Sequence, residues 1–407
     1  MATQSTDVCI AGGGPAGVML GLLLARAGVD VVVLEKHPDF FRDFRGDTVH
    51  PSTLNLIDAL GLRARFDAIA HTPLERLDVV LNGIRIHAVD FASLPAPNRS
   101  VTLMPQWDLL DLLADAGAQH PSFHLRMDAE VTGVIERDGR VTGIRTRDGD
   151  EITARLVVAA DGRTSTVRRA LGLVPREIPV DTDVLWFRVP RPARPVPDTL
   201  AWANRAGLAI TIPRPDYLQC ALLVPKGSLD ALREAGIGAF RERVGRVVPR
   251  LADVVGAIGS FDDVKHLNVQ IDRLPRWWRP GALCIGDAAH AMSPVFGVGI
   301  NYAVQDAVAA ARVLIPALRP GASSPARTTA DAVDAACAAV QRRRAWATAT
   351  MQRVQRAAHR FLGTGQVARL LDNPPTRTQR AVLRVALPLL RPVLARVVGY
   401  GFRPERL

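Results

Sequence analysis

The first 35 residues hold the feature that restricts the fold most, a glycine-rich turn between an apolar strand and an apolar helix. The run DVCIA, residues 7–11, is typical of a buried strand, and GGGPAG, residues 12–17, follows it directly. The helix-like run VMLGLLLARAG and a second apolar run, VDVVVLE, complete a strand–helix–strand unit. Such a unit belongs to a parallel sheet whose crossover helix covers one face. We therefore expect an α/β chain built on a parallel sheet.

The glycines of this turn have the spacing G-x-G-x-x-G. Gly12 permits a tight turn, Gly14 lets the backbone approach a pyrophosphate, and Gly17 allows the helix to pack closely on the strand. Pro15 and Ala16 open the helix, whose free N–H groups and positive end would face the phosphates. Because the motif follows a strand and starts a helix, it predicts dinucleotide binding in preference to a purely structural turn.

A carboxylate stands at the end of the second strand. Glu35 is placed to accept hydrogen bonds from a ribose diol, and its charge disfavours a 2′-phosphate. Lys36, the next residue, is included in the same cofactor-binding set. NAD and FAD share this loop, so the loop alone leaves the choice between them open.

Farther along, the chain alternates buried strands with antiparallel pieces. The runs LVVAA, residues 156–160, and ALCI, residues 282–285, are typical of central parallel strands. Hairpin turns are expected at Asn82-Gly83 and Asp138-Gly139. The other expected elements are three strands within 181–225, a strand over 266–272, helices over 106–119, 229–257, after Gly299 and past 331, and helix breaks at 373–375 and Pro388.

The net charge of +11 is concentrated at one end of the chain. Residues 341–407 carry 14 arginines, no lysine and two acidic residues, whereas the first 340 residues carry 37 basic and 38 acidic residues. No aromatic platform is interleaved with the arginines, so the charge gives no case for a nucleic-acid partner. The segment 380–402 could lie on an anionic membrane surface, but we favour packing on its own domain or on a second subunit.

Targeting and redox signals are few. The N-terminus lacks a basic signal-peptide region, and no window is long and apolar enough for a transmembrane segment. The four cysteines are far apart, so we expect no metal site and a reduced, cytoplasmic setting. Cys9 and Cys284 stand in apolar strand-like runs, and we expect both to be inert core thiols.

Two further segments place a carboxylate directly after a buried strand. AADGRTSTVR, residues 159–168, brings Asp161, and GDAAHAMSPVFGVGIN, residues 286–301, brings Asp287 and His290. Burying such groups is costly unless something pairs with them. Either these strand ends are exposed turns or a ligand is bound there.

Together with RDFRGDTVHPSTL, residues 42–54, these segments resemble the fingerprints of the group A flavoprotein monooxygenases, the p-hydroxybenzoate hydroxylase-like family. The order and spacing agree over about residues 5–325. The resemblance implies a Rossmann-like FAD-binding domain interrupted by a β-sheet substrate domain, which is a mixed α/β and α+β fold. It implies an FAD-binding domain over 1–73, 100–178 and 266–325, a substrate domain over 74–99 and 179–265, and a basic C-terminal helical region over 326–407.

The resemblance also assigns residues to FAD. Asp287 would accept hydrogen bonds from ribityl hydroxyls, and Pro294 would line the flavin ring near its reactive carbon. A helix N-terminus beside the pyrimidine edge would stabilise the negative charge of a reduced flavin. The other residues assigned to the cofactor are Arg45, preferred over Arg42, together with Gln106, Val131, Asp161, Gly297, Gly299, Ile300 and Asn301.

The remaining candidates have weaker assignments. His50 follows the arginine segment and could face the active site, without a defined role, whereas we expect His290 to be scaffolding. The substrate sheet offers Trp186, Phe187, Trp202 and Tyr217 as pocket-lining candidates, although each could be ordinary core.

By this resemblance, NADPH or NADH reduces FAD, and O2 then forms a flavin C4a-hydroperoxide that hydroxylates an aromatic or polyketide-like small molecule. The hydroperoxide requires a pocket that excludes water. No second G-x-G-x-x-G follows another strand, so the reductant would dock transiently. An FAD-dependent epoxidase, a Baeyer–Villiger enzyme, a dehydrogenase and a non-enzymatic flavin-binding sensor remain alternatives, and a homodimer is considered. A halogenase is disfavoured, because LWFRVP stands where a W-x-W-x-I-P segment would be expected.

Overall fold

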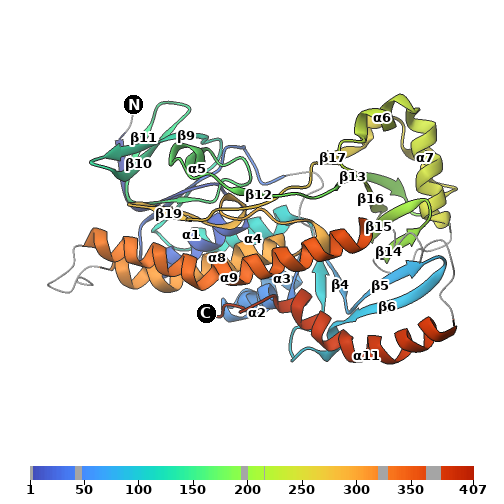
Figure 1. Cartoon of the computed structure of the whole chain (residues 1–407). Coiled ribbons are helices and arrows are strands. Elements are labelled where there is room, and N and C mark those ends of the chain that lie inside the picture. Colours follow the sequence, from blue (N-terminus) through green and yellow to red (C-terminus); the bar gives the residue numbers. More distant parts are fainter. Residues whose placement is uncertain (1–2, 42–47, 194–199, 215, 320–328, 364–376) are drawn as a thin grey trace.

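An eight-stranded sheet carries the glycine-rich turn (Figure 1). The structure is a computed structural model, and it describes all residues except 1–2, 42–47, 194–199, 215, 320–328 and 364–376. The strands of this sheet are β1 (Thr3–Ala11), β2 (Val31–Leu34), β8 (Phe123–Arg126), β9 (Val131–Arg137), β10 (Arg140–Thr146), β11 (Glu151–Ala159), β19 (Trp278–Arg279) and β20 (Ala282–Cys284).

Five of these strands are parallel, in the spatial order β20-β11-β1-β2-β8. The chain leaves β1 toward β2 and β8 on one side, and it later adds β11 and β20 on the other. The strand order therefore reverses between β1 and β11, where Val8 pairs with Leu156. Ligands of open parallel sheets bind at such a switch point, outside the carboxyl ends of the strands.

Helices cover one face of this sheet. Figure 1 shows α1 and α4 next to the sheet, with α8 and α9 stacked along them. Contrary to the expectation that no window is long and apolar enough for a transmembrane segment, Val295–Leu318, which includes α8, is so by length and composition. However, 78% of its most apolar window is buried inside the protein, as expected of a core helix. The helices of this half are α1 (Pro15–Arg26), α2 (Pro51–Ala59), α3 (Arg63–Asp67), α4 (Gln106–Ala118), α5 (Thr166–Ala170), α8 (Gly299–Leu318) and α9 (Thr329–Gly363).

A seven-stranded sheet forms the other half, in the order β17-β13-β16-β15-β14-β5-β6. Residues alternate between its two faces. Leu185 and Phe187 pack with the helix α7, whereas Val184 and Trp186 point to the opposite face. Its elements are β5 (Arg76–Leu81), β6 (Ile84–Asp90), β13 (Thr182–Pro190), β14 (Leu200–Asn204), β15 (Gly207–Pro213), β16 (Tyr217–Pro225), β17 (Lys265–Leu267), α6 (Leu229–Glu234) and α7 (Gly236–Val247).

Two small sheets link the halves. One has the order β3-β7-β4, and the other pairs β12 with β18. Short 3-10 turns include η5 (Gly286–Ala288) and η6 (Val295–Gly297). The strands are β3 (Thr48–Val49), β4 (Thr72–Leu74), β7 (Val101–Leu103), β12 (Arg176–Ile178) and β18 (Ile271–Arg273).

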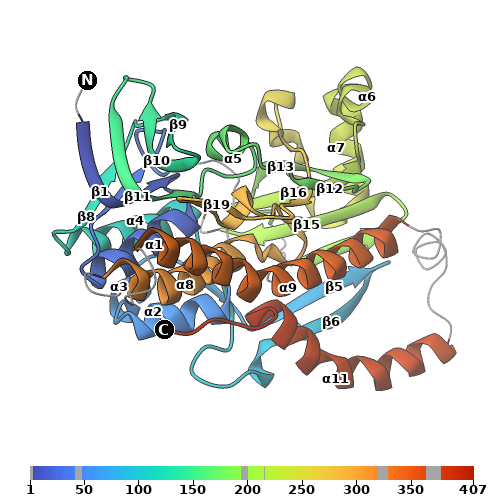
Figure 2. The same cartoon turned by 60° about the vertical axis from the view of Figure 1, so that its left-hand side comes forward.

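The C-terminal helix α11 (Arg377–Tyr400) packs on the protein itself. Ala395 and Val398 are buried against Val89 and Phe91, and Figure 2 shows α11 running beneath β5 and β6. The expectation that Pro388 ends a helix is wrong, since α11 continues through it. Pro388 is exposed, so water can satisfy the carbonyl that loses its partner to the proline.

The expected mixed α/β architecture is confirmed, but further local expectations are wrong. The single helix expected over 229–257 is two helices, α6 and α7, and α7 ends at Val247. Residues 266–272 do not form one strand: they contribute to β17 and β18, which belong to different sheets. The strand β14 was not expected, and it pairs in parallel with the distant β5. The division into domains remains a prediction; the strands of the two large sheets fall within the two sets of ranges except β17, which crosses the boundary between residues 265 and 266.

All four cysteines are free and buried. Burial raises the pKa of Cys9 to about 12 and raises the pKa values of Cys220, Cys284 and Cys337 as well, so all four remain thiols at neutral pH. Within the part of the chain that the structure describes, no group of three or more His, Cys, Asp or Glu residues could hold a metal ion.

Candidate active site

The glycine loop lies at the switch point, and its three motif glycines have different surroundings. A Cβ atom on Gly12 would stand 2.4 Å from the carbonyl oxygen of Ala160, and one on Gly17 would stand 1.9 Å from the carbonyl oxygen of Gly12. A Cβ on Gly14 would meet nothing within 4 Å. Packing therefore requires the outer two glycines, while the middle one borders open space.

The helix α1 begins at this opening. Pro15 occupies its first position, and Val18 donates the first intrahelical bond, to the carbonyl of Gly14 at 3.0 Å. The amides of Ala16 and Gly17 are thus among those that a helix start leaves without an intrahelical acceptor. Such a cluster of N–H groups is suited to a phosphate.

Glu35 lies beside the loop at the end of β2. Its buried carboxylate accepts hydrogen bonds from the N–H of Gly13 at 3.0 Å and of His37 at 3.2 Å. The side chain thus holds the loop and the following turn together, in the position expected for a ribose contact. Lys36 is exposed next to it.

The two later fingerprints converge on the glycine loop. A Cβ on Gly12 would lie 2.8 Å from the Cα of Asp161, and one on Gly286 would lie 3.2 Å from the Cβ of Ala16. Asp287, which follows Gly286, pairs with Arg163 at 3.0 Å, and both side chains are partly exposed. No sequence signal pointed to this arginine beyond its place in the second fingerprint.

Asp161 has a structural task of its own. One carboxylate oxygen accepts hydrogen bonds from the N–H groups of Thr166 and Val167, at 2.8 and 3.1 Å, and so caps α5. The other oxygen, Oδ1, is buried without a partner among the described residues. Burial raises the pKa of Asp161, against the lowering effect of its hydrogen bonds.

The segment before α2 holds the glycine turn of residues 296–301. Thr48 donates a hydrogen bond to the carbonyl of Gly297 at 2.8 Å, and His50 Nε2 lies 3.0 Å from the same oxygen. Ser52 donates to Asn301 Oδ1 at 2.5 Å. These hydroxyls, which the sequence reasoning missed, stand in the TVHPST run, residues 48–53, after the arginine segment.

His50 is fully buried and neutral at physiological pH. Burial lowers its pKa to about 4, although its hydrogen bond to Gly297 opposes that shift. Because a carbonyl can only accept, Nε2 carries the hydrogen, and Nδ1 is left without a partner in the described part of the structure. His50 therefore holds Gly297 and is poorly suited to donate protons.

The wall next to this turn is strained. Phe296 has a φ of 68°, a value that is rare for a residue with a side chain. Pro294 is half-buried just before it, and Gly299 begins α8 with open space at its Cβ position. Ile300 is buried in the first turn of that helix.

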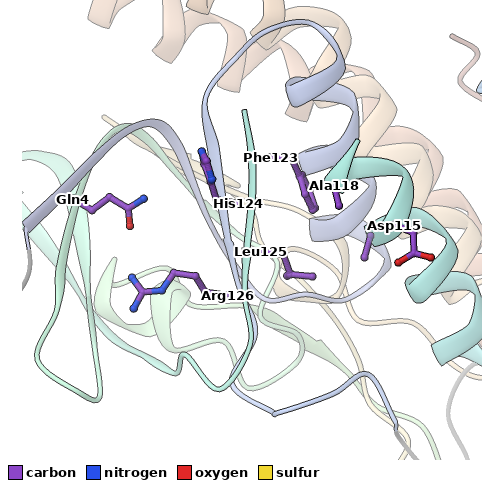
Figure 3. Close-up of a pocket in the computed structure, with 8 residues that line it drawn as sticks. Gln4, Asp115, Ala118, Phe123, His124, Leu125 and Arg126 are labelled. Atoms are coloured by element: carbon purple, nitrogen blue, oxygen red, sulfur yellow. The ribbon is translucent and has the colours of Figure 1, made fainter. Parts of the chain in front are cut away.

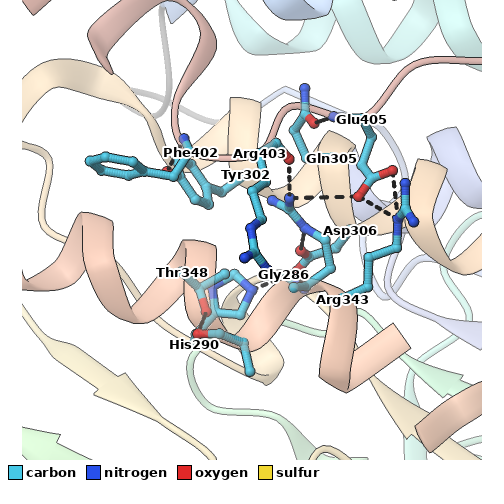
Figure 4. Close-up of polar contacts among 12 residues, drawn as sticks. Gly286, His290, Tyr302, Gln305, Asp306, Arg343, Thr348, Phe402, Arg403 and Glu405 are labelled. Atoms are coloured by element: carbon cyan, nitrogen blue, oxygen red, sulfur yellow. Dashed lines mark hydrogen bonds and ion pairs between the residues drawn. The ribbon is translucent and has the colours of Figure 1, made fainter. Parts of the chain in front are cut away.

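Behind this wall lies a buried charge network (Figure 4). Asp306 accepts hydrogen bonds from the Gly286 N–H at 3.1 Å and from Arg344 Nε at 2.8 Å, and it lies 2.5 Å from His290 Nε2. Burial alone would raise the pKa of Asp306, but His290 and Arg344 together bring it below its usual value. His290 is thus tied into the interior, in line with a scaffolding role.

The network continues to the end of the chain. Arg344 donates to the carbonyl of Arg403 at 3.2 Å, and Arg343 Nε lies 2.7 and 2.8 Å from the two carboxylate oxygens of Glu405. The backbone N–H of Glu405 in turn donates to Gln305. Residues 401–405 therefore lock onto α8 and α9 directly behind residues 286–290.

The substrate candidates divide between the two faces of the seven-stranded sheet. Trp186 and Tyr217 lie on the face turned away from α7, where Trp186 packs with Leu103 of the small sheet. Phe187 and Trp202 are buried on the α7 side, where Trp202 donates to Thr211 at 3.0 Å. Only Trp186 and Tyr217 therefore remain on the face that continues to the glycine turn.

The other cofactor candidates are scattered around the glycine loop. Gln106 is the first residue of α4 and half-buried, and Val131 is buried at the start of β9. Arg42 and Arg45 lie outside the described residues.

Two cavities lie away from these loops. One, of about 570 Å³, runs along the edge strand β8 (Figure 3). A second, of about 540 Å³, borders Trp202 on the α7 side of the other sheet. The residues shown lining the first are Gln4, Asp115, Ala118, Phe123, His124, Leu125 and Arg126.

The observed cradle fits FAD. The helix start and the open position at Gly14 suit a pyrophosphate, and Glu35 is within reach of a ribose on that loop. Farther on, buried polar atoms without partners in the described structure, Asp161 Oδ1 and Asn301 Nδ2, line the path that a long dinucleotide would follow to the glycine turn. The donor set is one for hydrogen bonds and phosphate, not for a metal.

Comparison with known proteins agrees with this geometry. The FAD binding domain family matches residues 5–345. A 6-methylpretetramide 4-monooxygenase of Streptomyces rimosus is 36% identical over 99% of this chain and 94% of its own, and a protoasukamycin 4-monooxygenase of Streptomyces nodosus is 29% identical over 78% and 81%. The structure of a probable FAD-dependent monooxygenase from Pseudomonas aeruginosa superposes with a TM-score of 0.76 at 26% identity, over 91% of this chain and all of the other. The chain therefore belongs to the FAD binding domain family, as an FAD-dependent monooxygenase of the group A type.

Proposed function

We propose that this enzyme hydroxylates a polycyclic, polyketide-derived aromatic compound at the expense of NAD(P)H and O2. In the balanced reaction, substrate–H, O2, NAD(P)H and a proton give substrate–OH, NAD(P)⁺ and water. The observation that carries the proposal is the convergence of four segments distant in sequence on one edge of the parallel sheet, beside an apolar face of the second sheet. The 36% identity to a monooxygenase named for 6-methylpretetramide supports the substrate class.

In this proposal the chain holds FAD along the path just described. The amides at the start of α1 bind the pyrophosphate, Glu35 binds a ribose, and Asp287 turns from Arg163 to the ribityl hydroxyls. The start of α8 at Gly299 stabilises negative charge on the pyrimidine edge of the ring. The bound flavin supplies the redox chemistry of oxygen activation.

The substrate would lie between Pro294 and the inner face of the seven-stranded sheet. Leu74, Leu103 and Ile212 form an apolar cluster there, with Trp186 packed against it. The indole N–H of Trp186 has no partner among the described residues, so it can donate a hydrogen bond to a substrate oxygen. Tyr217 is half-buried at the rim, where Arg188 stacks over its ring at 5.0 Å.

The first test is turnover by the purified protein. We expect a yellow protein whose NAD(P)H oxidation rises with a tetracyclic aromatic polyketide and yields a product heavier by one oxygen atom. A product that has lost two hydrogens without O2 uptake would indicate a dehydrogenase instead. An epoxide or a ring-expanded ester or lactone would indicate the epoxidase or Baeyer–Villiger alternatives, and absence of any turnover would favour a sensor.

The pocket has its own test. Trp186→Phe keeps an aromatic side chain but removes the indole N–H donor, so the KM for the substrate should rise several-fold with little change in FAD affinity. Trp202→Phe is the matched control, because Trp202 lies on the opposite face. Equal effects of the two substitutions on KM would contradict the assigned face.

The domains, the location and the assembly of the enzyme follow from the same proposal. We retain the division into an FAD-binding domain (1–73, 100–178 and 266–325), a substrate domain (74–99 and 179–265) and a C-terminal helical region (326–407). We place the enzyme in the cytoplasm, where NAD(P)H is available and free cysteines such as Cys9 stay reduced. A homodimer is the proposed assembly, and light scattering of the purified protein would test it.

A further inference from the structure

Three polar side chains on one face of α9 contact the segment that contains Pro294. Gln352, Gln355 and His359 recur at helical spacing, so they share a face of the helix. All three are buried, with exposures of 1%, 0% and 7%. They lie beyond residues 5–345, the part that the family comparison covers.

The two glutamines bind the backbone of residues 291–295. Gln355 Oε1 accepts from the Ser293 N–H at 3.2 Å, and its Nε2 donates to the carbonyls of Ser293 at 2.9 Å and Val295 at 3.0 Å. Gln352 Nε2 donates to the carbonyls of Ala291 at 2.9 Å and Asp272 at 2.7 Å. The glutamine side chains of α9 thus hold the backbone of residues 291–295 through hydrogen bonds, much as the backbone of a neighbouring β-strand would.

His359 connects the same segment to the second sheet. Its Nε2 lies 2.6 Å from Ser293 Oγ, and its Nδ1 lies 2.9 Å from Thr182 Oγ1 on β13. Ser293 Oγ already accepts the N–H of Val295 at 3.1 Å. Burial lowers the pKa of His359, although Asp181 opposes the shift, so the ring is neutral at pH 7.

The neutral ring carries one hydrogen, so one of its nitrogens donates and the other accepts. His359 therefore connects the Ser293 hydroxyl to the Thr182 hydroxyl, as a donor on one side and an acceptor on the other. Thr182 lies on the same face of β13 as Trp186, four residues away, because side chains alternate along a strand.

We propose that Gln352, Gln355 and His359 are positioning residues that complete the active site from outside the FAD-binding domain, and that His359 couples the Pro294 wall to the substrate face through Ser293 and Thr182. The coupling rests on the proposed function, whereas the fixation of residues 291–295 does not. A substrate that shifts β13 would thereby adjust the wall beside the flavin. Loosening this link should let reducing equivalents reach O2 without hydroxylation, as NAD(P)H, a proton and O2 giving NAD(P)⁺ and H2O2.

Two substitutions of His359 separate its two contacts. A glutamine amide can occupy the place of Nε2 and an asparagine amide the place of Nδ1, so His359→Gln keeps the Ser293 contact and His359→Asn keeps the Thr182 contact. Gln355→Ala removes the backbone contacts. Gln341→Ala is the matched control, because Gln341 binds the backbone of Trp277 and Pro275 from the same helix in the same manner, away from Pro294.

The experiment is hydrogen–deuterium exchange on the FAD-loaded protein, read in peptides that cover residues 289–297 and 180–188. We expect exchange at the amides of Ser293 and Val295 to rise about fivefold to tenfold in Gln355→Ala and His359→Asn, and to stay near wild type in His359→Gln and Gln341→Ala. The fraction of NAD(P)H recovered as H2O2 should rise in all three variants at 355 and 359, but not in Gln341→Ala.

Two outcomes would overturn the inference. Unchanged exchange at residues 293–295 in Gln355→Ala and His359→Asn would show that these side chains do not hold the segment in place. Equal changes in Gln341→Ala would show that the effect comes from a general loss of helix stability. A normal H2O2 fraction in His359→Gln would remove the coupling. If no substrate is hydroxylated at all, the proposed function fails while the exchange result still decides the fixation.

Discussion

Replacing Asp306 by asparagine tests the buried network behind the cofactor wall. The side chain is fully buried and receives the Gly286 N–H on one oxygen and Arg344 on the other. An asparagine must turn its NH2 group toward one of these donors, and it leaves Arg344, only 1% exposed, without its nearest countercharge. Its remaining acidic neighbour, Glu405, is 4.0 Å away.

The size of the effect follows from this burial. Removing one partner of a buried ion pair costs about 3–5 kcal/mol. Unfolding of all 407 residues as one unit carries an entropy of about 0.85 kcal/mol/K, so the Tm should fall by roughly 4–6 °C. FAD should also be retained less well, because Gly286 directly precedes Asp287.

The assay is thermal unfolding of the apo and FAD-loaded forms beside a surface control. Asp115→Asn breaks the pair with Arg65, whose side chains are 69% and 45% exposed, and should shift the Tm by less than about 1 °C. A second change, Arg344→Met, should restore part of the loss in the Asp306 variant. The reasoning is refuted if the Tm of Asp306→Asn, like that of the surface control, lies within 1 °C of the wild-type value.

Three other predictions concern the cradle itself. Gly14→Ala should leave the Tm of the apo protein unchanged, since its methyl group meets nothing within 4 Å, yet raise the Kd for FAD at least about tenfold by holding the pyrophosphate off the backbone. Gly17→Ala, whose methyl group would stand 1.9 Å from a carbonyl oxygen, should instead destabilise the fold, so similar melts and similar FAD titrations for both variants would count against the assignment. His50 has a pKa of about 4 in the folded protein, below its ordinary value of 6.5. Between these two pH values only the unfolded chain gains a proton, which favours unfolding. The free energy of unfolding should therefore be about 2 kcal/mol lower at pH 5 than above pH 6.5. His50→Gln can still donate to Gly297 but does not titrate, and parallel denaturant stabilities of the variant and the wild type from pH 7 to 5 would disprove this account. Asp287→Ala should raise the Kd for FAD roughly tenfold to a hundredfold, measured by ultrafiltration, and full FAD occupancy after purification would contradict its role.

The parts of the site predicted from sequence are those written in local spacing. The strand, the glycines, the helix and Glu35 lie within 30 residues, and each follows from backbone geometry. His290 was expected to be scaffolding, but its partner Asp306 could not be identified, because the pair depends on how η5 packs on α8. Arg344 and Glu405 lie farther still along the chain, in a segment whose arginine-rich composition indicated only a basic tail.

The second sheet was less predictable for a different reason. Trp186 and Trp202 are the same residue type in similar strand-like runs, and only the register of β13, β16, β15 and β14 shows that they face opposite sides. The strand β14 pairs with β5, more than 100 residues away, so no local sequence pattern could predict this pairing. Side-chain alternation shows which residues of one strand share a face, but which residues of different strands share that face depends on how the strands pair in the folded sheet.

The tie between Glu405 and residues near 286 has a consequence for biosynthesis. All four fingerprints have left the ribosome before Arg343 and Arg344 are made, and well before Glu405. Until then Asp306 stands in the nascent chain without its arginine partner, and the wall beside the flavin lacks the contacts that the later residues make behind it. The support of the wall beside the flavin thus depends on residues made after all four fingerprints, so we expect a polypeptide that stops before Arg343 to retain FAD poorly.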